Sequence, residues 1–239
     1  MAQYLLKQIS SPIISIENNV NRNSEPILIK QTKEFVRKHL EHAEGGHDWW
    51  HIVRVHRNAL NLAEKYEVNY LVIELAALLH DIADPKFHHG NEETGPNLAT
   101  DFLRRQDVDE IVVNEVEYII RHMSFKNTFS FSGNKSLEFQ IVEDADRLDA
   151  IGAIGVARAF SFGGYKLRPF YDPDVPPAQF TNSEKYKAST SPTINHFYEK
   201  LLLIKDMMNT DEAKAMAEKR HLFMLRFLDE FYSEWEGQS

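Results

Sequence analysis

The sequence contains no cysteine among its 239 residues. Without thiols the chain can form neither a disulfide nor a thiolate metal site, and it has no cysteine nucleophile. Any bound metal must therefore be held by His, Asp or Glu side chains.

An excess of positive charge is also missing, because 27 Lys and Arg residues stand against 36 Asp and Glu residues. The formal charge of −9 argues against binding to DNA, RNA or anionic lipid, all of which attract basic surfaces. A small anionic substrate is compatible with this charge if cations gather locally.

Long hydrophobic runs are absent too. The longest, Leu75 to Leu79, is far shorter than the roughly 20 residues of a membrane-spanning helix. The N-terminal residues MAQYLLKQISSPIISIE lack the basic start and apolar stretch of a secretory signal. We therefore expect a cytoplasmic protein.

Helical periodicity dominates the rest of the sequence, and no strand-like alternation of useful length occurs. Ile52, Val55, Ala59 and Leu62 show the spacing of a buried helix face. The pattern predicts an all-α fold with helices at 24–43, from Asp48 as cap to about Tyr66, and at 71–82, 92–105, 108–123, 136–149, 150–161, 193–209 and from 211 onward.

Two stretches lack this pattern. Residues 1–23 are interpreted as an N-terminal extension, and 24–239 as one domain. Residues 162–192 are rich in Gly, Pro, Asp and Ser and predict a long irregular loop, a kind of segment that is often functional. It carries the cations Lys166, Arg168, Lys185 and Lys187. Two hypotheses are that it closes over a substrate and that it is a solvated excursion without a role.

Polar residues at apolar helix positions are the most informative feature. His51 borders the buried face of one helix, His80 and Asp81 end the apolar run LAALLHDIAD, and Asp146 lies among apolar residues in EDADRLDA. A carboxylate at such a position needs a cation, several donors or the solvent at the helix end. Two imidazoles and two carboxylates leave octahedral positions open for water, which suits Mn²⁺ first, and also Mg²⁺, Co²⁺, Ni²⁺ or Fe²⁺.

A different metal motif is conceivable in GHDWWH, where His47 and His51 have the spacing of a zinc-protease helix. Asp48 is one methylene shorter than the Glu that this motif requires. Gly45 and Gly46 also indicate that the helix begins at Asp48, which leaves His47 outside it. We therefore favour the first set.

Three blocks of the sequence, HDWWHIVRV, LAALLHDIAD and EDADRLDAIGAIGVARAF, resemble the HD-domain superfamily of metal-dependent phosphohydrolases, in particular its small stand-alone bacterial members. The resemblance extends through INHFYEKLL and EKRHLFMLRFL, over about residues 30–235. It implies an HD-domain helical bundle around one divalent ion, bound by His51, His80, Asp81 and Asp146. This set agrees with the one derived from the pattern.

The resemblance further implies hydrolysis of phosphate esters or anhydrides, commonly of nucleotides. In several relatives the acid three positions after the HD aspartate assists proton transfer, and that position is Asp84 here. Capping a helix before Pro85 is its alternative role. His122 resembles a position that binds a second metal or phosphate in some relatives, although a structural histidine fits there as well.

Cations are expected to bind the phosphate oxygens. Arg54 is the first candidate because it shares the face of His51 and can hold two oxygens at once. Lys86 and Arg158 follow, with an ion pair to Asp149 as the alternative for Arg158. Arg147 and Arg121 are expected to be solvated or paired with neighbouring acids.

The leading functional hypothesis is a phosphohydrolase that releases pyrophosphate from nucleoside triphosphates or phosphate from monophosphates. A second is an iron oxygenase on a similar helical scaffold, which the four-ligand set disfavours because two irons need further histidines. His88 and His89 follow His80 too closely to supply the paired histidines of the dinuclear members, so one metal is expected. A third is a metal-stabilised nucleotide-binding or sensor domain without catalysis.

Overall fold

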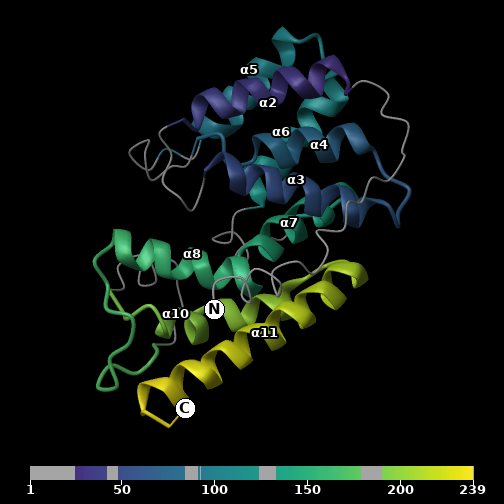
Figure 1. Ribbon diagram of the computed structural model, residues 1–239. Coiled ribbons are helices and arrows are strands. Elements are labelled where there is room, and N and C mark those ends of the chain that lie inside the picture. Colours follow the sequence, from purple (N-terminus) through teal and green to yellow (C-terminus); the bar gives the residue numbers. More distant parts are fainter. Residues whose placement is uncertain are drawn as a thin grey trace, which may run out of the picture.

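The computed structural model describes residues 25–41, 48–83, 91, 93–123, 133–178 and 190–238. Within these ranges the chain is helical and contains no strand, which confirms the all-α prediction (Figure 1). The helices are α2 (Ile27–His39), α3 (Trp49–Ala63), α4 (Tyr70–Leu79), α5 (Thr94–Arg105), α6 (Glu110–His122), α7 (Leu137–Asp149), α8 (Gly152–Tyr165), α10 (Asn195–Glu199), the 3₁₀ helix η3 (Leu201–Met207) and α11 (Asp211–Trp235).

Helix α7 lies between two groups of helices (Figure 1). On one side it packs against α3 and α4. Helix α4 also packs against α2 and α6, and α5 packs against α6. On the other side it contacts α8 and the long α11, which also packs against η3. Residues on α7 can therefore meet partners from both halves of the fold.

Buried apolar residues hold α3 and α4 in position beside α7. In α3 the expected face of Ile52, Val55, Ala59 and Leu62 is at most 1% exposed. Most of α4, from Val72 to Leu79, is buried, as expected of a helix enclosed by neighbours on several sides. These contacts fix the ends of α3 and α4 next to α7.

The corner between α7 and α8 depends on a glycine. Gly152 follows Ile151 with a φ of +78°, a conformation that other residues rarely adopt. A Cβ atom there would also come within 2.9 Å of the Arg220 side chain of α11. The corner directs α8 back past the end of α7, where Arg158 reaches Asp149.

Most predicted helix boundaries lie within a few residues of those observed, but three differ more. Helix α2 ends at His39 rather than near 43, because the chain leaves helical geometry at Leu40. Helix α8 continues to Tyr165, so the irregular segment begins later than 162. The helix predicted at 193–209 is broken at Lys200 into α10 and η3, and the tighter winding of η3 buries Leu201 and Ile204.

The described parts of the predicted loop beyond α8, residues 166–178 and 190–192, are irregular. The next two residues hold the loop in place, since the amides of Thr193 and Ile194 donate to the carbonyls of Pro169 and Phe170 at 2.9 Å. Lys166 lies over the Tyr165 ring and Arg168 over the Phe162 ring. The extension 1–23 and the cations Lys185 and Lys187 lie outside the described residues.

None of the helices within the described ranges combines the length and the apolar character that crossing a membrane would require.

Candidate metal centre

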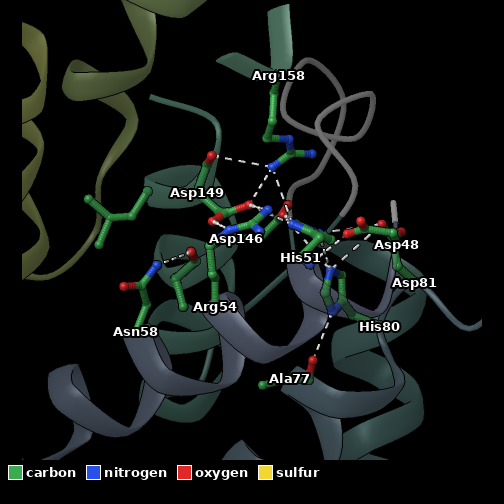
Figure 2. Close-up of polar contacts among 12 residues, drawn as sticks. Asp48, His51, Arg54, Asn58, Ala77, His80, Asp81, Asp146, Asp149 and Arg158 are labelled. Atoms are coloured by element: carbon green, nitrogen blue, oxygen red, sulfur yellow. Dashed lines mark hydrogen bonds and ion pairs between the residues drawn. The ribbon is translucent and has the colours of Figure 1, made fainter. Parts of the chain in front are cut away.

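Helix α3 supplies His51 from its first turn. The helix begins after Asp48, whose carboxylate accepts the backbone amide of His51 at 2.9 Å. This confirms Asp48 as the N-cap, so its carboxylate serves the backbone. His47, the other residue of the zinc-protease alternative, lies outside the described residues. Arg54 follows one turn after His51 and points toward the same region (Figure 2).

The end of α4 supplies His80 and Asp81. His80 is the C-cap, and its Nδ1–H donates to the carbonyl of Ala77 at 3.0 Å. The donor role of Nδ1 follows from this partner, because a carbonyl can only accept. The other ring nitrogen, Nε2, is then an acceptor and faces His51.

Helix α7 supplies Asp146 and Asp149 from its last turn. Carboxylates are unfavourable at a helix C-terminus, where the macrodipole is negative, unless cations lie nearby. The carbonyls of this turn accept side-chain donors: Asn58 donates to Ala145 O at 3.3 Å, and Arg220 donates to Leu148 O. These contacts from α3 and α11 hold the end of α7 in place.

Four acceptor atoms from these three helices converge (Figure 2). His51 Nε2 lies 3.3 Å from His80 Nε2, 3.6 Å from Asp81 Oδ2 and 3.4 Å from Asp146 Oδ1. His80 Nε2 lies 3.8 Å from each of these carboxylate oxygens. Four acceptors this close repel one another, and a shared cation would relieve the repulsion. The ligand atoms of His51, His80 and Asp81 all lie within 4.8 Å of one another, so these three could hold one ion, and Asp146 Oδ1 lies beside both histidine nitrogens.

The second nitrogen of His51 completes the arrangement. Its Nδ1 lies 2.8 Å from Asp149 Oδ2, so Nδ1–H donates and Nε2 is left as an acceptor facing the cluster. A histidine whose outer nitrogen donates to a carboxylate or a backbone carbonyl is characteristic of metal ligands. His51 and His80 each show this feature, with different kinds of acceptor.

Burial is graded across the cluster. The side chains of His51 and His80 are 1% and 4% exposed, whereas those of Asp81 and Asp146 are 23% and 38% exposed. Burial holds the pKa of His51 below its ordinary value, which favours the neutral ring that a metal requires. The carboxylates therefore mark the side of the cluster that faces solvent.

Asp149 lies behind His51 and is 2% exposed. Arg54 binds it through Nε at 2.6 Å and Nη2 at 3.0 Å, and Arg158 binds it through Nη1 at 2.6 Å. Burial alone would raise the pKa of Asp149, but the hydrogen bonds from His51 and Arg54 lower it well below its ordinary value. The group is thus an ionised carboxylate.

The other predicted site residues have separate outcomes. Asp84 and Lys86, as well as His88 and His89, lie outside the described residues. His122 donates from Nδ1 to the Tyr118 carbonyl at 2.8 Å, and its ring packs against that of Tyr118.

Arg147 and Arg121 are paired with acids, as expected. Arg147 binds Glu143, and Arg121 binds Glu93 and Glu117. The ion pair with Asp149 that was the alternative for Arg158 is present.

Asp149 is not among the site residues predicted from the sequence, where it is only the alternative ion-pair partner of Arg158. A signal was present, because His51 and Arg54 are three residues apart on α3, and Asp146 and Asp149 are three apart on α7. Since α3 and α7 pack together, the two spacings place one pair against the other.

The family model of the HD domain matches residues 49–151, from the start of α3 to just past α7. These residues include all four converging side chains.

Similar proteins extend the match over most of the chain. Uncharacterised protein YpgQ of Bacillus subtilis is 34% identical over 213 residues, which cover 87% of this chain and 94% of YpgQ. The crystal structure of an HD-superfamily hydrolase from Bacillus thuringiensis is 44% identical, with a TM-score of 0.70, and the match covers 88% of this chain and 98% of that one. The structure of YpgQ in complex with ADP is 32% identical, with a TM-score of 0.68, over 88% of this chain and 100% of that one.

Proposed function

This chain belongs to the HD-domain superfamily, and on that premise we propose that it is a divalent-metal-dependent phosphohydrolase that acts on nucleotides. The observation that carries the proposal is the convergence of four acceptor atoms from three helices, in which each histidine is held by a hydrogen bond that its Nδ1–H donates. The carboxylates of Asp81 and Asp146 lie on the solvent side of the cluster, which fits an open catalytic site better than a closed structural one.

We propose that His51, His80, Asp81 and Asp146 hold the ion, with Mn²⁺ as the first candidate. The mixed nitrogen and oxygen donors fit an octahedral ion with positions left for water. When bound, such an ion lowers the pKa of a water molecule and offsets the charge of a phosphoryl group.

The arginines behind the ligands support an anionic substrate. Asp81, Asp146 and Asp149 together with Arg54 and Arg158 leave one net negative charge, which a divalent ion converts into one net positive charge. Arg54 uses Nε and Nη2 on Asp149, so Nη1 is the edge that can face a phosphate oxygen. We assign Arg54 to phosphate binding and to stabilising the charge that develops in the transition state, with Arg158 beside it.

Three further assignments rest on sequence position. We propose that Asp84 moves a proton during hydrolysis and that Lys86 binds and neutralises the phosphate. Both follow Asp81 within five residues. His122, at the end of α6, is proposed to contact substrate.

The nucleotide part of the proposal is supported by the relative YpgQ, whose structure was determined in complex with ADP. Either pyrophosphate is released from a triphosphate or phosphate from a monophosphate, and the two products distinguish the reactions. No nucleic-acid or membrane partner is proposed, in keeping with the charge of −9.

The test is a matrix of metals and nucleotides. Metal-stripped protein is combined with Mn²⁺, Co²⁺, Ni²⁺ or Mg²⁺ and a nucleotide panel, and phosphate and pyrophosphate are measured separately. Activity should require the ion and be lost with chelator. Binding of nucleotide without turnover under every condition would instead support the sensor alternative.

A matched pair of variants sharpens this test. Arg54→Ala should raise KM by about tenfold or more with a smaller change in kcat. Arg57→Ala removes an exposed arginine one turn further along α3 and should leave both constants unchanged. Asp84→Asn should mainly lower kcat, and an unchanged kcat would remove Asp84 from the mechanism.

A further inference from the structure

One buried carboxylate holds three groups of the candidate site. Asp149 accepts hydrogen bonds from His51 on α3, Arg54 on α3 and Arg158 on α8. Its Oδ2 atom is the acceptor for all three side chains, and its Oδ1 atom accepts Arg54 Nε as well. A crowded, buried acceptor of this kind restricts each of its donors to one orientation.

The effect on His51 concerns the tautomer of its ring. The carboxylate can only accept, so the ring proton stays on Nδ1 and Nε2 keeps its lone pair toward His80, Asp81 and Asp146. His80 is oriented by a backbone carbonyl, which cannot be removed by substitution. Of the two histidines, His51 is therefore the one whose orientation depends on a side chain.

The effect on the arginines concerns their position. Arg54 and Arg158 come from different helices, and like charges would separate them. Asp149 holds both within 3.0 Å of one carboxylate, while their side chains stay 30% and 19% exposed. Arg158 Nη1 lies only 3.2 Å from His51 Nδ1, a contact of two donors that the shared Oδ2 atom makes tolerable.

We propose that Asp149 is a positioning residue that fixes the metal-facing tautomer of His51 and holds Arg54 and Arg158 beside the ion, so that one carboxylate assembles both the metal and the phosphate sites. The phosphate half rests on the function proposed above. The metal half stands on the histidine geometry alone.

The first measurement needs no variant. In metal-free wild-type protein labelled with ¹⁵N, the two ring nitrogens of His51 report the tautomer by their chemical shifts. We expect Nδ1–H with an unprotonated Nε2. The opposite tautomer in the folded protein would overturn the proposal.

Asp149→Asn then removes the charge while nearly keeping the shape. An amide offers one acceptor oxygen and adds an NH₂ donor, so it cannot serve the three side chains. We expect a mixture of His51 tautomers and Mn²⁺ binding weakened by about 10- to 100-fold, the range found when partners of metal ligands are removed. Binding of inorganic pyrophosphate, measured by calorimetry, should weaken as well.

Two controls separate positioning from general stability. Asp149→Glu keeps the charge and should restore most of the Nδ1–H tautomer. Glu117→Gln breaks an ion pair with Arg121 on α6 and should change neither affinity. If folded Asp149→Asn protein keeps the wild-type tautomer, Mn²⁺ affinity and pyrophosphate affinity, the proposal is wrong.

The two proposals can fail separately. If no nucleotide is hydrolysed, the proposed function fails, yet the tautomer and the Mn²⁺ affinity still decide the role of Asp149. If hydrolysis occurs and Asp149→Asn leaves kcat and KM unchanged, the positioning role fails alone.

Discussion

Helix α7 presents acidic side chains to two different surroundings within one short stretch of sequence. Asp144 is fully buried and accepts four hydrogen bonds at 2.8–2.9 Å, from the backbone and side chains of Asn209 and Thr210. Glu143 beside it binds Arg147 and Lys135. Every one of these partners is a donor, so Glu143 and Asp144 are satisfied by the protein itself and need no bound ion.

Asp146, two residues later, has the opposite environment. Its Oδ1 atom faces the acceptor nitrogens of His51 and His80, and its side chain is 38% exposed. An acid surrounded by donors stabilises the fold. An acid among other acceptors is repelled by them unless a cation binds between them. Asp144 and Asp146 are the same residue type in the block EDADRLDA, and their partners and their burial distinguish them.

The largest effect that this comparison predicts is on catalysis. Asp146→Asn should lower turnover by about a thousandfold or more, about 4 kcal/mol of transition-state stabilisation, because a proposed ligand is lost. In chelator the same variant should be as stable as the wild type or slightly more stable, since a repelling charge is removed. Nucleotide assays and urea denaturation check the two parts. A variant that is active but clearly destabilised would show that Asp146 stabilises the fold, as Glu143 and Asp144 do, and is not a metal ligand.

The second effect is on stability. Asp144→Ala should lower the free energy of unfolding by about 3 kcal/mol or more, because the backbone amides of Asn209 and Thr210 and the Thr210 hydroxyl lose their acceptor. Asp211→Ala, an exposed aspartate of α11 paired with Lys214, should cost less than about 1 kcal/mol. Urea denaturation measures both. In the folded fraction of Asp144→Ala the metal content should be unchanged. A loss of metal would show that Asp144 is also required for metal binding.

These two clusters also show what could be predicted from the sequence. The helices and the isolated polar positions His51, His80, Asp81 and Asp146 were visible because periodicity marks a buried face and makes a polar residue on it stand out. The structure brings these four side chains together, and their role as ligands stays a prediction. The break at Lys200 was not visible, because the apolar residues 197, 201 and 204 fit one continuous helix equally well.

The partners of the buried acids could not be predicted for a different reason. Asn209 and Thr210 are more than 60 residues from Asp144 and carry no pattern that links them to it. Asp149 depends on Arg158 across the corner at Gly152, so its position follows from how α8 turns back. Such contacts are set by tertiary packing, and local periodicity does not encode them.

The third effect is on stability in the presence of metal. Binding to the folded state alone stabilises a protein by about 2.7 kcal/mol at an ion concentration of 100 Kd. Wild-type protein and folded Asp211→Ala should show this gain with Mn²⁺, whereas Asp146→Asn should lose most of it. Denaturation curves with and without the ion provide the measurement. Equal stabilisation of Asp146→Asn and wild type would place the ion elsewhere.

The smallest effect on stability should come from Lys135, at the edge of the cluster that Glu143 and Asp144 form with their donors. Lys135 binds Glu143 Oε2 at 2.6 Å, but its side chain is 24% exposed, and Glu143 also has Arg147 and Asn209 as partners. Lys135→Met should therefore cost only about 1 kcal/mol. Arg147→Met should cost about 3 kcal/mol, since Arg147 is 7% exposed and also donates to the Met207 carbonyl at 2.6 Å. Urea denaturation of the two variants tests this order. If Lys135→Met lowers the free energy of unfolding as much as Arg147→Met, the remaining donors of Glu143 do not compensate for a lost one. The contrast between Glu143, with its several donors, and Asp146, which lies among acceptors, would then not explain their stability effects.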